Sequence, residues 1–179
     1  MSKFVYVTYI RTTPDKLWDA LTKPEFTRAY WCGTSHECDW EAGSDWRIMI
    51  PDGRVGDSGK VLEINRARRL VLSWRDEFMP ELKAEGYSRA SFEIETVGDT
   101  VRLTVTHEID LDNSKLIEGV SNGWPAILSS LKSMLETGTA LELTSRWPDN
   151  LCPAASIAGR PGRRGLHLAP PQAGRLRGG

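Results

Sequence analysis

The sequence predicts one α+β domain, in which an antiparallel sheet carries its helices on one face. Three observations lead to this class. The expected elements follow the order strand, two short helices, six strands and one long helix. The last two strands alternate apolar and polar residues, which is typical of a sheet with one covered and one wet face. A length of 179 residues is sufficient for a single core.

The first strand is expected at residues 4–12, FVYVTYIRT, which are rich in β-branched and aromatic side chains. Thr13 and Pro14 end this strand, and Pro14 suits the first turn of a helix. The segment DKLWDALT then spaces its apolar residues on one helical face, and a second short helix, EFTRAYW, follows it. Two short helices are therefore expected directly after the first strand.

After Gly33 the pattern is that of strands. The segments THECDW, SDWRIMI, GKVLEIN and RLVLSWRD are separated by turn-forming residues, which predicts antiparallel hairpins. A charged loop near residues 77–86 leads into two further strands, RASFEIETV and TVRLTVTHEI. With the first strand these segments make a seven-stranded sheet.

The long helix is expected over residues 115–137, after an N-cap in the Leu111–Ser114 segment. Proline inside a helix costs about 3 kcal/mol, but little in the first turn. Pro125 therefore predicts a break or kink within residues 121–123 and a separate or angled turn over 114–121. The main helix then runs from about Trp124 and ends at Gly138. A curved sheet around this helix leaves a space of the kind that binds small molecules.

Composition indicates a globular, cytoplasmic protein. Hydrophobic residues make up 40% and charged residues 26% of the chain. No apolar run approaches the roughly 20 residues of a membrane span, and the N-terminus does not resemble a signal peptide. Three cysteines are too few for a disulfide framework, so we expect free thiols.

We divide the chain into a domain over residues 1–140 and a disordered tail over 141–179. From Arg146 onward, six Arg stand against one Asp, and six Gly and five Pro interrupt any periodicity. Residues 1–145 have the opposite charge balance, with 17 Lys and Arg against 23 Asp and Glu. Arginine-rich tails are found in proteins that contact nucleic acid or anionic lipid, but this one lacks interleaved aromatic residues. Nucleic acid is therefore not an expected partner.

Two patterns resemble catalytic or metal-binding motifs, and neither is complete. The GDSGK segment, with Ser58 at its centre, resembles a nucleophile loop but is explained by turn-forming residues at a strand entry, and it lacks phosphate-loop spacing. Cys32, His36 and Cys38 are zinc-ligand types on one side of a strand, but a structural zinc site needs a fourth ligand. We expect no metal, no cofactor and no catalytic residue that can be named.

Seven tryptophans are the most unusual feature of the composition. Each indole buries roughly 150–250 Å² and usually needs a partner for its N–H, so these residues either pack the core or wall a pocket. The candidates for a ligand pocket are Trp46, Trp74, Phe92, His107, Trp124 and Leu128. His107 is either a core histidine or a general base with Glu63 or Glu108, because imidazole titrates in the range that such work requires.

Five segments together resemble a known family: PDKLWDALTKPE, WEAGSDWRI, GKVLEINRARRLVLSW, TVRLTVTHE and GWPAILSSLKSMLETG. They are similar to homologues of the activator of heat-shock protein 90 ATPase, within the START-like (SRPBCC) superfamily. The resemblance covers residues 3–138. It implies a helix-grip fold with a hydrophobic cavity between the sheet and the long C-terminal helix, and a link to the stress response.

The resemblance implies several functions on one scaffold, since the superfamily includes lipid carriers, polyketide cyclases and chaperone regulators. Our first hypothesis is non-catalytic binding of a small hydrophobic or aromatic molecule. The second is an enzyme of polyketide cyclase or hydrolase type that uses His107. The third is an interaction protein, either a chaperone-ATPase modulator or a homodimer joined through a sheet edge. Eukaryotic co-chaperones of the family carry a further N-terminal domain, so full chaperone activation is not expected of a chain that begins at its first strand.

Overall fold

The computed structural model describes residues 1–148, and the predicted tail beyond Pro148 lies outside the described residues. One antiparallel sheet has the strand order β1-β7-β6-β5-β4-β3-β2. The strands are β1 (Ser2–Ile10), β2 (Ser35–Cys38), β3 (Asp45–Met49), β4 (Val55–Asn65), β5 (Arg69–Asp76), β6 (Ser88–Val97) and β7 (Thr100–Ile109). The helices are α1 (Pro14–Thr22), α2 (Pro24–Tyr30), α3 (Pro80–Lys83), α4 (Lys115–Thr137) and the 3₁₀ turn η1 (Glu142–Thr144). The seven-stranded sheet and its helices confirm the predicted fold class.

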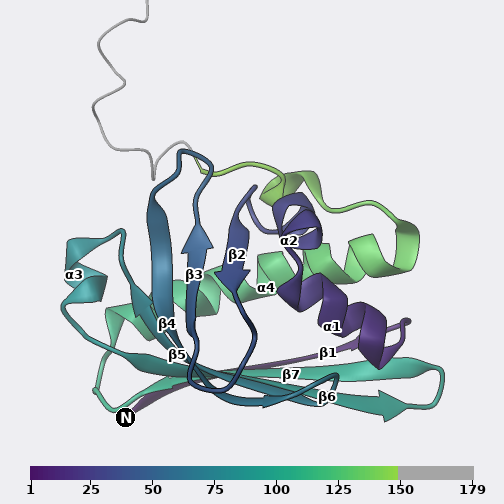
Figure 1. Cartoon of the computed structure of the whole chain (residues 1–179), viewed down its shortest axis with the longest axis horizontal. Helices are drawn as coiled ribbons and strands as arrows, with labels where there is room; N and C mark the ends of the chain where they lie inside the picture. Colours follow the sequence, from purple (N-terminus) through teal and green to yellow (C-terminus); the bar gives the residue numbers. More distant parts are fainter. Residues whose placement is uncertain (149–179) are drawn as a thin grey trace, which may run out of the picture. The chain divides into compact units, whose positions relative to one another are not determined.

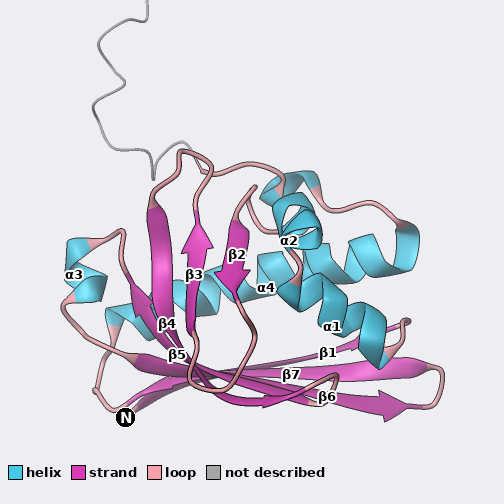
Figure 2. Cartoon of the chain, viewed as in Figure 1, coloured by secondary structure: helices cyan, strands magenta, loops and turns pink. Residues whose placement is uncertain are grey.

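The sheet curves so that its inner face holds α4, with α1 and α2 on the same side (Figures 1 and 2). β1 and β2 are the two edge strands. β1 joins the far end of the sheet, since Ser2 lies opposite Ile109 on β7 and Ile10 lies opposite Val101. Val5 and Val7 on the outer face of β1 remain about half exposed, at 50% and 48%. The first strand of the chain is therefore held by the last one.

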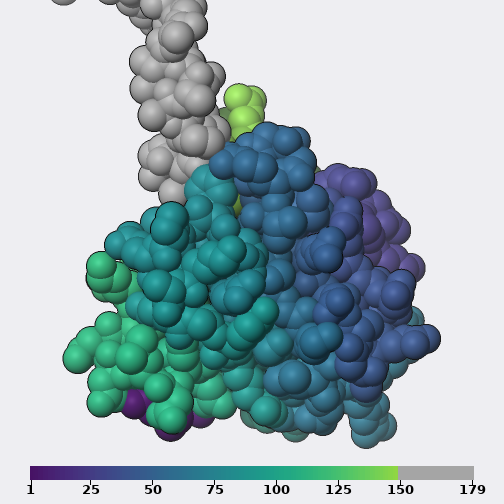
Figure 3. Space-filling model, turned by 60° about the vertical axis from the view of Figure 1, so that its left-hand side comes forward, coloured from purple at the N-terminus to yellow at the C-terminus, as the bar shows by residue number. Residues whose placement is uncertain are grey.

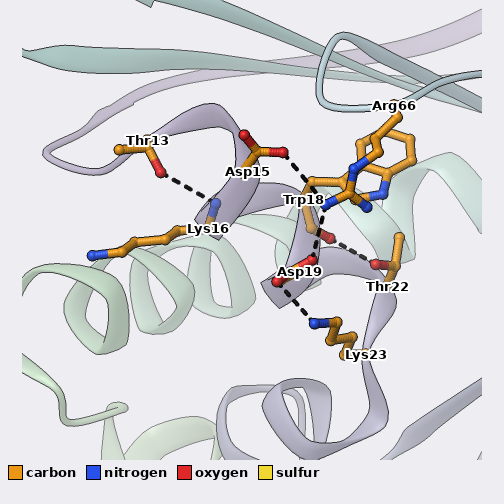
Figure 4. A network of polar contacts seen from close by, with 8 residues as sticks. All are labelled: Thr13, Asp15, Lys16, Trp18, Asp19, Thr22, Lys23 and Arg66. Atoms are coloured by element: carbon orange, nitrogen blue, oxygen red, sulfur yellow. Dashed lines mark hydrogen bonds and ion pairs between the residues drawn. The ribbon is translucent and has the colours of Figure 1, made fainter.

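Helix α1 begins where the sequence predicts, because Thr13 accepts the Lys16 N–H and Pro14 occupies the first turn. Arg66, in the turn between β4 and β5, reaches across to α1 (Figure 4). Its guanidinium lies 3.4 Å from a carboxylate oxygen of Asp15 and 3.5 Å from one of Asp19. These ion pairs join α1 to the hairpin of β4 and β5.

Helix α4 runs without a break from Lys115 to Thr137, so the predicted break before Pro125 and the separate first turn are wrong. Pro125 cannot donate to the carbonyl four residues earlier. Buried side chains hold the helix on both sides of it, with Ile117 before the proline and Leu128 after it. Packing of this face outweighs the missing hydrogen bond. The predicted end at Gly138 is confirmed, since this residue has a φ of 81° and caps the helix.

The N-terminus of α4 is held by Glu85, which follows α3. The Glu85 carboxylate accepts hydrogen bonds from the Ser114 hydroxyl at 2.5 Å, from the Lys115 N–H at 2.8 Å and from the Leu116 N–H at 3.2 Å. Figure 3 shows this part of the surface, where the teal α3 segment meets the green start of α4. Burial opposes the ionisation of Glu85, but these hydrogen bonds outweigh it and lower its pKa.

The Glu85→Ala variant is expected to lose about 1.5–3 kcal/mol of unfolding free energy, because it removes charge-assisted bonds at a helix N-terminus. Urea denaturation at pH 7 measures this loss. Glu81→Ala is the matched control, since exposed Glu81 makes only a 3.2 Å ion pair with Lys115. We expect that control to change stability by less than about 0.5 kcal/mol. Equal effects of the two substitutions would contradict the assigned role of Glu85.

The chain continues after α4 as a strap, which we define as residues 139–148. The Leu141 N–H donates to the Ser130 hydroxyl of α4 at 2.9 Å, and the Thr144 carbonyl accepts the Cys32 N–H at 2.7 Å. Thr144 is buried. The compact unit extends to Pro148 and so includes the strap. The strap cannot be predicted from apolar periodicity, because it is held through backbone groups, which every residue type has.

The GDSGK segment, expected as turn-forming residues at a strand entry, lies within β4, which already begins at Val55. Ser58 donates to Glu77 at 2.6 Å, in a cluster with Arg75 and Lys83. Gly59 is required by a close approach between β4 and β5. A β-carbon at this position would lie 1.8 Å from the Ser73 carbonyl oxygen.

Candidate ligand site in the aromatic core

All six predicted pocket residues are buried, none more than 4% exposed. The six come from four strands and from α4. Five of them belong to one hydrophobic core cluster: Trp46 on β3, Trp74 on β5, Phe92 on β6, and Trp124 and Leu128 on α4. The sixth, His107 on β7, contacts Trp74 and Trp124 of this cluster, with ring centroids 5.4 Å and 6.3 Å apart. The sheet supplies one wall and α4 the other. The structure therefore brings together the residues that the sequence grouped, while their role as a pocket stays a prediction.

Trp74 is at the centre of the aromatic contacts. Its ring centroid lies 4.5 Å from that of Trp46, 5.4 Å from His107 and 5.7 Å from Trp124. Trp124 also meets Phe92 edge to face at 5.7 Å. These tilted and T-shaped arrangements are the ones that aromatic pairs favour. The rings themselves occupy the space between these strands and α4, so a ligand needs one of them to move.

Trp31, which the sequence did not assign to the site, completes the cluster. It follows α2, and its ring stacks on Trp74 at 6.2 Å and meets Trp124 edge-on at 5.2 Å. His36 lies on its other side at 5.0 Å. The sequence offered one signal for Trp31, its place beside Tyr30 at the end of the second predicted helix. Its contacts depend on the turn between α2 and β2, which local sequence does not specify.

Hydrogen bonds fix the tautomer of His107. The Trp124 indole N–H donates to His107 Nδ1 at 3.3 Å, so this nitrogen carries the lone pair. The proton is therefore on Nε2, which donates to the Ser88 hydroxyl at 2.7 Å. Ser88 in turn donates to the Trp74 carbonyl at 2.8 Å. This series of hydrogen bonds connects α4 to β5, and each side-chain nitrogen or oxygen in it has a partner.

This network does not suit general-base catalysis by His107. The ring is fully buried, and burial lowers its pKa to about 4. Its basic nitrogen is already occupied by the Trp124 N–H. The two carboxylates expected near it point elsewhere, since exposed Glu63 pairs with Arg69 at 3.0 Å and Glu108 pairs with Lys3 at 3.5 Å. The geometry therefore favours the core interpretation of His107.

Asp57 is a second polar group at the border of the aromatic cluster. It accepts the Trp74 indole N–H at 2.7 Å. Burial raises its pKa to about 7, and the nearby carboxylates of Asp76 and Glu77 add to this effect. Asp57 lies directly opposite Asp76 in the ladder of β4 and β5. The Trp46 N–H is also satisfied, by the Ser73 carbonyl at 2.9 Å.

His36 differs from His107 in its hydrogen bonding. Its Nδ1 lies 3.1 Å from the Leu21 carbonyl, while its buried Nε2 has no hydrogen-bond partner in the described part of the chain. Burial lowers the pKa of His36 to about 4, against a smaller opposing effect of the Leu21 bond. Cys38 accepts the Trp40 N–H through its sulfur at 3.1 Å. Within residues 1–148, no three His, Cys, Asp or Glu side chains are placed to hold a metal ion.

Comparison with solved structures supports the same architecture. A protein from Mesorhizobium loti, MLL2253, aligns with a TM-score of 0.65 at 20% identity, covering 75% of this chain and 96% of its own. The Aha1 dimer from Colwellia psychrerythraea aligns with a TM-score of 0.61 at 20% identity, covering 77% and 98%. An HSP90 activator from Plasmodium falciparum gives 0.60 at 20% identity, covering 75% and 96%. A search of curated proteins finds no match.

The curved antiparallel sheet around a long C-terminal helix defines a START-like helix-grip protein. Residues 11–136 match the family model described as Activator of Hsp90 ATPase homolog 1-like protein. The chain belongs to this family, which confirms the resemblance found in the sequence. None of the helices in the described residues combines the length and apolar character that a membrane crossing requires.

Proposed function

We propose that the chain is a non-catalytic binding protein for a small aromatic or hydrophobic molecule, held between the sheet and α4. The observation that carries this proposal is the convergence of four indoles, Phe92 and two buried histidines on one place in the core. Ligand sites are lined mainly by apolar and aromatic side chains with a few placed polar groups, and this composition fits that description.

Trp31 is the ring that moves in this proposal. The indole N–H groups of Trp46, Trp74 and Trp124 all have hydrogen-bond partners. Packing alone holds the Trp31 indole among the described residues, and at 8% it is the most exposed ring of the cluster. Its backbone leads into Cys32, which has a φ of 52°. Rotation of the Trp31 side chain breaks no hydrogen bond of its indole, so among the four indoles it is the least costly to move.

Ligand uptake is expected to quench tryptophan fluorescence and to raise the melting temperature, because a ligand that binds only the folded state stabilises it. A panel of fatty acids, flavonoids and aromatic polyketides tests this expectation. Trp31→Ala is expected to raise the association rate roughly tenfold, since the closed state no longer limits binding. Trp147→Ala, which removes an indole that packs on Phe78, is the control and should leave the rate unchanged. A panel without quenching or thermal shift would refute the proposal.

A second candidate function is protein interaction through the free edge of β1. This strand is nine residues long, lies at the edge of the sheet and exposes Val5, Val7 and Tyr9. Exposed apolar edge strands are templates for pairing with another chain. A second copy or a chaperone are the partners to test. Sedimentation of the wild type and of Val5→Lys distinguishes a dimer from a monomer, and stimulation of a purified chaperone ATPase tests the other partner.

A further inference from the structure

We infer that His36 is the polar anchor of this ligand site, and that the ligand it recognises is a fused-ring aromatic molecule carrying a hydrogen-bond donor such as a phenolic hydroxyl. The inference rests on the proposed function and adds a substrate class to it. It is carried by His36 Nε2, a buried ring nitrogen that no hydrogen-bond donor of residues 1–148 satisfies.

The free atom is an acceptor. A carbonyl oxygen accepts hydrogen bonds only, so the 3.1 Å contact with Leu21 places the His36 proton on Nδ1. Nε2 then carries a lone pair. His36 is 7% exposed, and none of the described residues donates to this atom. Buried acceptors in folded proteins are normally paired, so an unpaired one indicates a group supplied from outside.

His107 provides an internal comparison for His36. Both histidines are buried in the same core, and burial lowers the pKa of both to about 4. They have opposite tautomers. His107 has its lone pair on Nδ1, where the Trp124 N–H satisfies it, whereas the lone pair of His36 is on Nε2. The fold therefore pairs one buried imidazole completely and leaves the other with an open acceptor.

The His36 ring adjoins the ring that moves. His36 meets Trp31 edge to face at 5.0 Å, and Trp31 in turn contacts Trp74 and Trp124. When Trp31 leaves, the vacated space has the dimensions of an indole. A fused-ring ligand in this space stacks on Trp74, as Trp31 does, and its edge lies beside His36. A donor on that edge pairs with Nε2.

The lone pair also determines which ligands are rejected. A hydroxyl or ring N–H donates a hydrogen bond to Nε2. An ether or carbonyl oxygen has no proton to donate, so its lone pairs would repel the lone pair of Nε2. A site with a buried polar group discriminates against analogues that leave this group unpaired. We expect a preference of roughly tenfold to a hundredfold for the donor-bearing ligand over a matched ether.

The test uses the full chain and two probes of equal ring size, 2-naphthol and 2-methoxynaphthalene. Isothermal titration calorimetry at pH 7 is expected to show tighter binding of 2-naphthol by the wild type. His36→Phe should bind both probes with equal affinity. Glu37→Gln is the control, because exposed Glu37 is the next residue of β2 and points to the other face. This control should retain the preference of the wild type.

A second measurement does not depend on any variant. In the wild type labelled with ¹⁵N-histidine, the Nε2 resonance of His36 should shift on addition of 2-naphthol and not on addition of 2-methoxynaphthalene. Equal affinity of the wild type for both probes, an unmoved Nε2 resonance, or a preference that persists in His36→Phe overturns the inference and leaves the proposed function standing. Binding of neither probe, nor of any molecule in the wider panel, overturns the proposed function itself.

Discussion

Replacing Gly59 with alanine is expected to lower the free energy of unfolding by at least about 3 kcal/mol. The added β-carbon would lie 1.8 Å from the Ser73 carbonyl oxygen, 2.7 Å from the Ser73 carbonyl carbon and 2.8 Å from Trp46 Nε1. The first two atoms are backbone of β5, which cannot rotate away as a side chain can. The strands must separate, and the hydrogen bond from Trp46 to the Ser73 carbonyl is lost with them.

Gly123→Ala provides the matched control for Gly59→Ala. Gly123 lies within α4, and a β-carbon there would have no neighbour within 4 Å. Because alanine loses less backbone entropy in a helix than glycine, this substitution should stabilise the protein by about 0.5–1 kcal/mol. Urea denaturation followed by circular dichroism measures both variants. An unchanged midpoint for Gly59→Ala would refute the close approach of β4 and β5.

The second large effect is expected for His107→Leu, which should cost roughly 2–4 kcal/mol at pH 7. Leucine fills most of the volume, but it offers no acceptor to the Trp124 N–H and no donor to the Ser88 hydroxyl oxygen. Two polar groups are then unpaired in the core. His107→Gln, which can accept and donate, should lose less. If leucine and glutamine have equal effects, the polar network does not contribute to stability.

The pH dependence of stability provides a further measurement on the same residue. His36 and His107 each have a pKa near 4 in the folded state against 6.5 in the unfolded state. Below pH 6.5 the unfolded chain therefore takes up protons that the folded chain does not, so each histidine removes about 1.4 kcal/mol of stability per unit of falling pH. Asp57, with its pKa raised to about 7, acts in the opposite direction.

The effect of Asp57 on the pH dependence cancels that of one histidine, so the effect of the other histidine remains. Wild-type stability is therefore expected to fall by about 1.4 kcal/mol per unit as the pH falls from 6.5 to about 5. His107→Leu retains only His36 and Asp57, whose effects cancel, so its stability should be nearly flat over the same window. Urea midpoints at several pH values test this. A variant with the wild-type slope would show that His107 is not a buried neutral imidazole.

Much of the fold follows from local patterns in the sequence. The alternation along β6 and β7 and the apolar stripe of α4 are sufficient to predict a sheet that grips a helix. Two features depended on long-range packing. Pro125 stays inside α4 because the residues on either side of it are buried, which a local helix rule does not include. The strap is held by the Thr144 and Leu141 backbones, which leave no apolar pattern.

The candidate site was predictable to a similar extent. The sequence grouped Trp46, Trp74, Phe92 and His107 on segments expected to face the interior, and all four side chains are buried. Trp31 and His36 were not grouped with them, because their place depends on how α2 and β2 fold back over the sheet. The tautomer of His36 depends on the carbonyl of Leu21, fifteen positions earlier in the chain. No spacing rule connects these two residues.

The pairing of β1 with β7 also determines the order in which the chain folds. During synthesis at about 5–20 residues per second, β1 leaves the ribosome roughly 5–20 seconds before β7. The hairpins from β2 to β5 have their partners nearby and can form in that interval. β1 must close a loop of about ninety residues, and contacts so distant in sequence form slowly. The first strand to be made therefore waits for the last strand, and until then its backbone N–H and C=O groups on the side of β7 are open to other nascent chains.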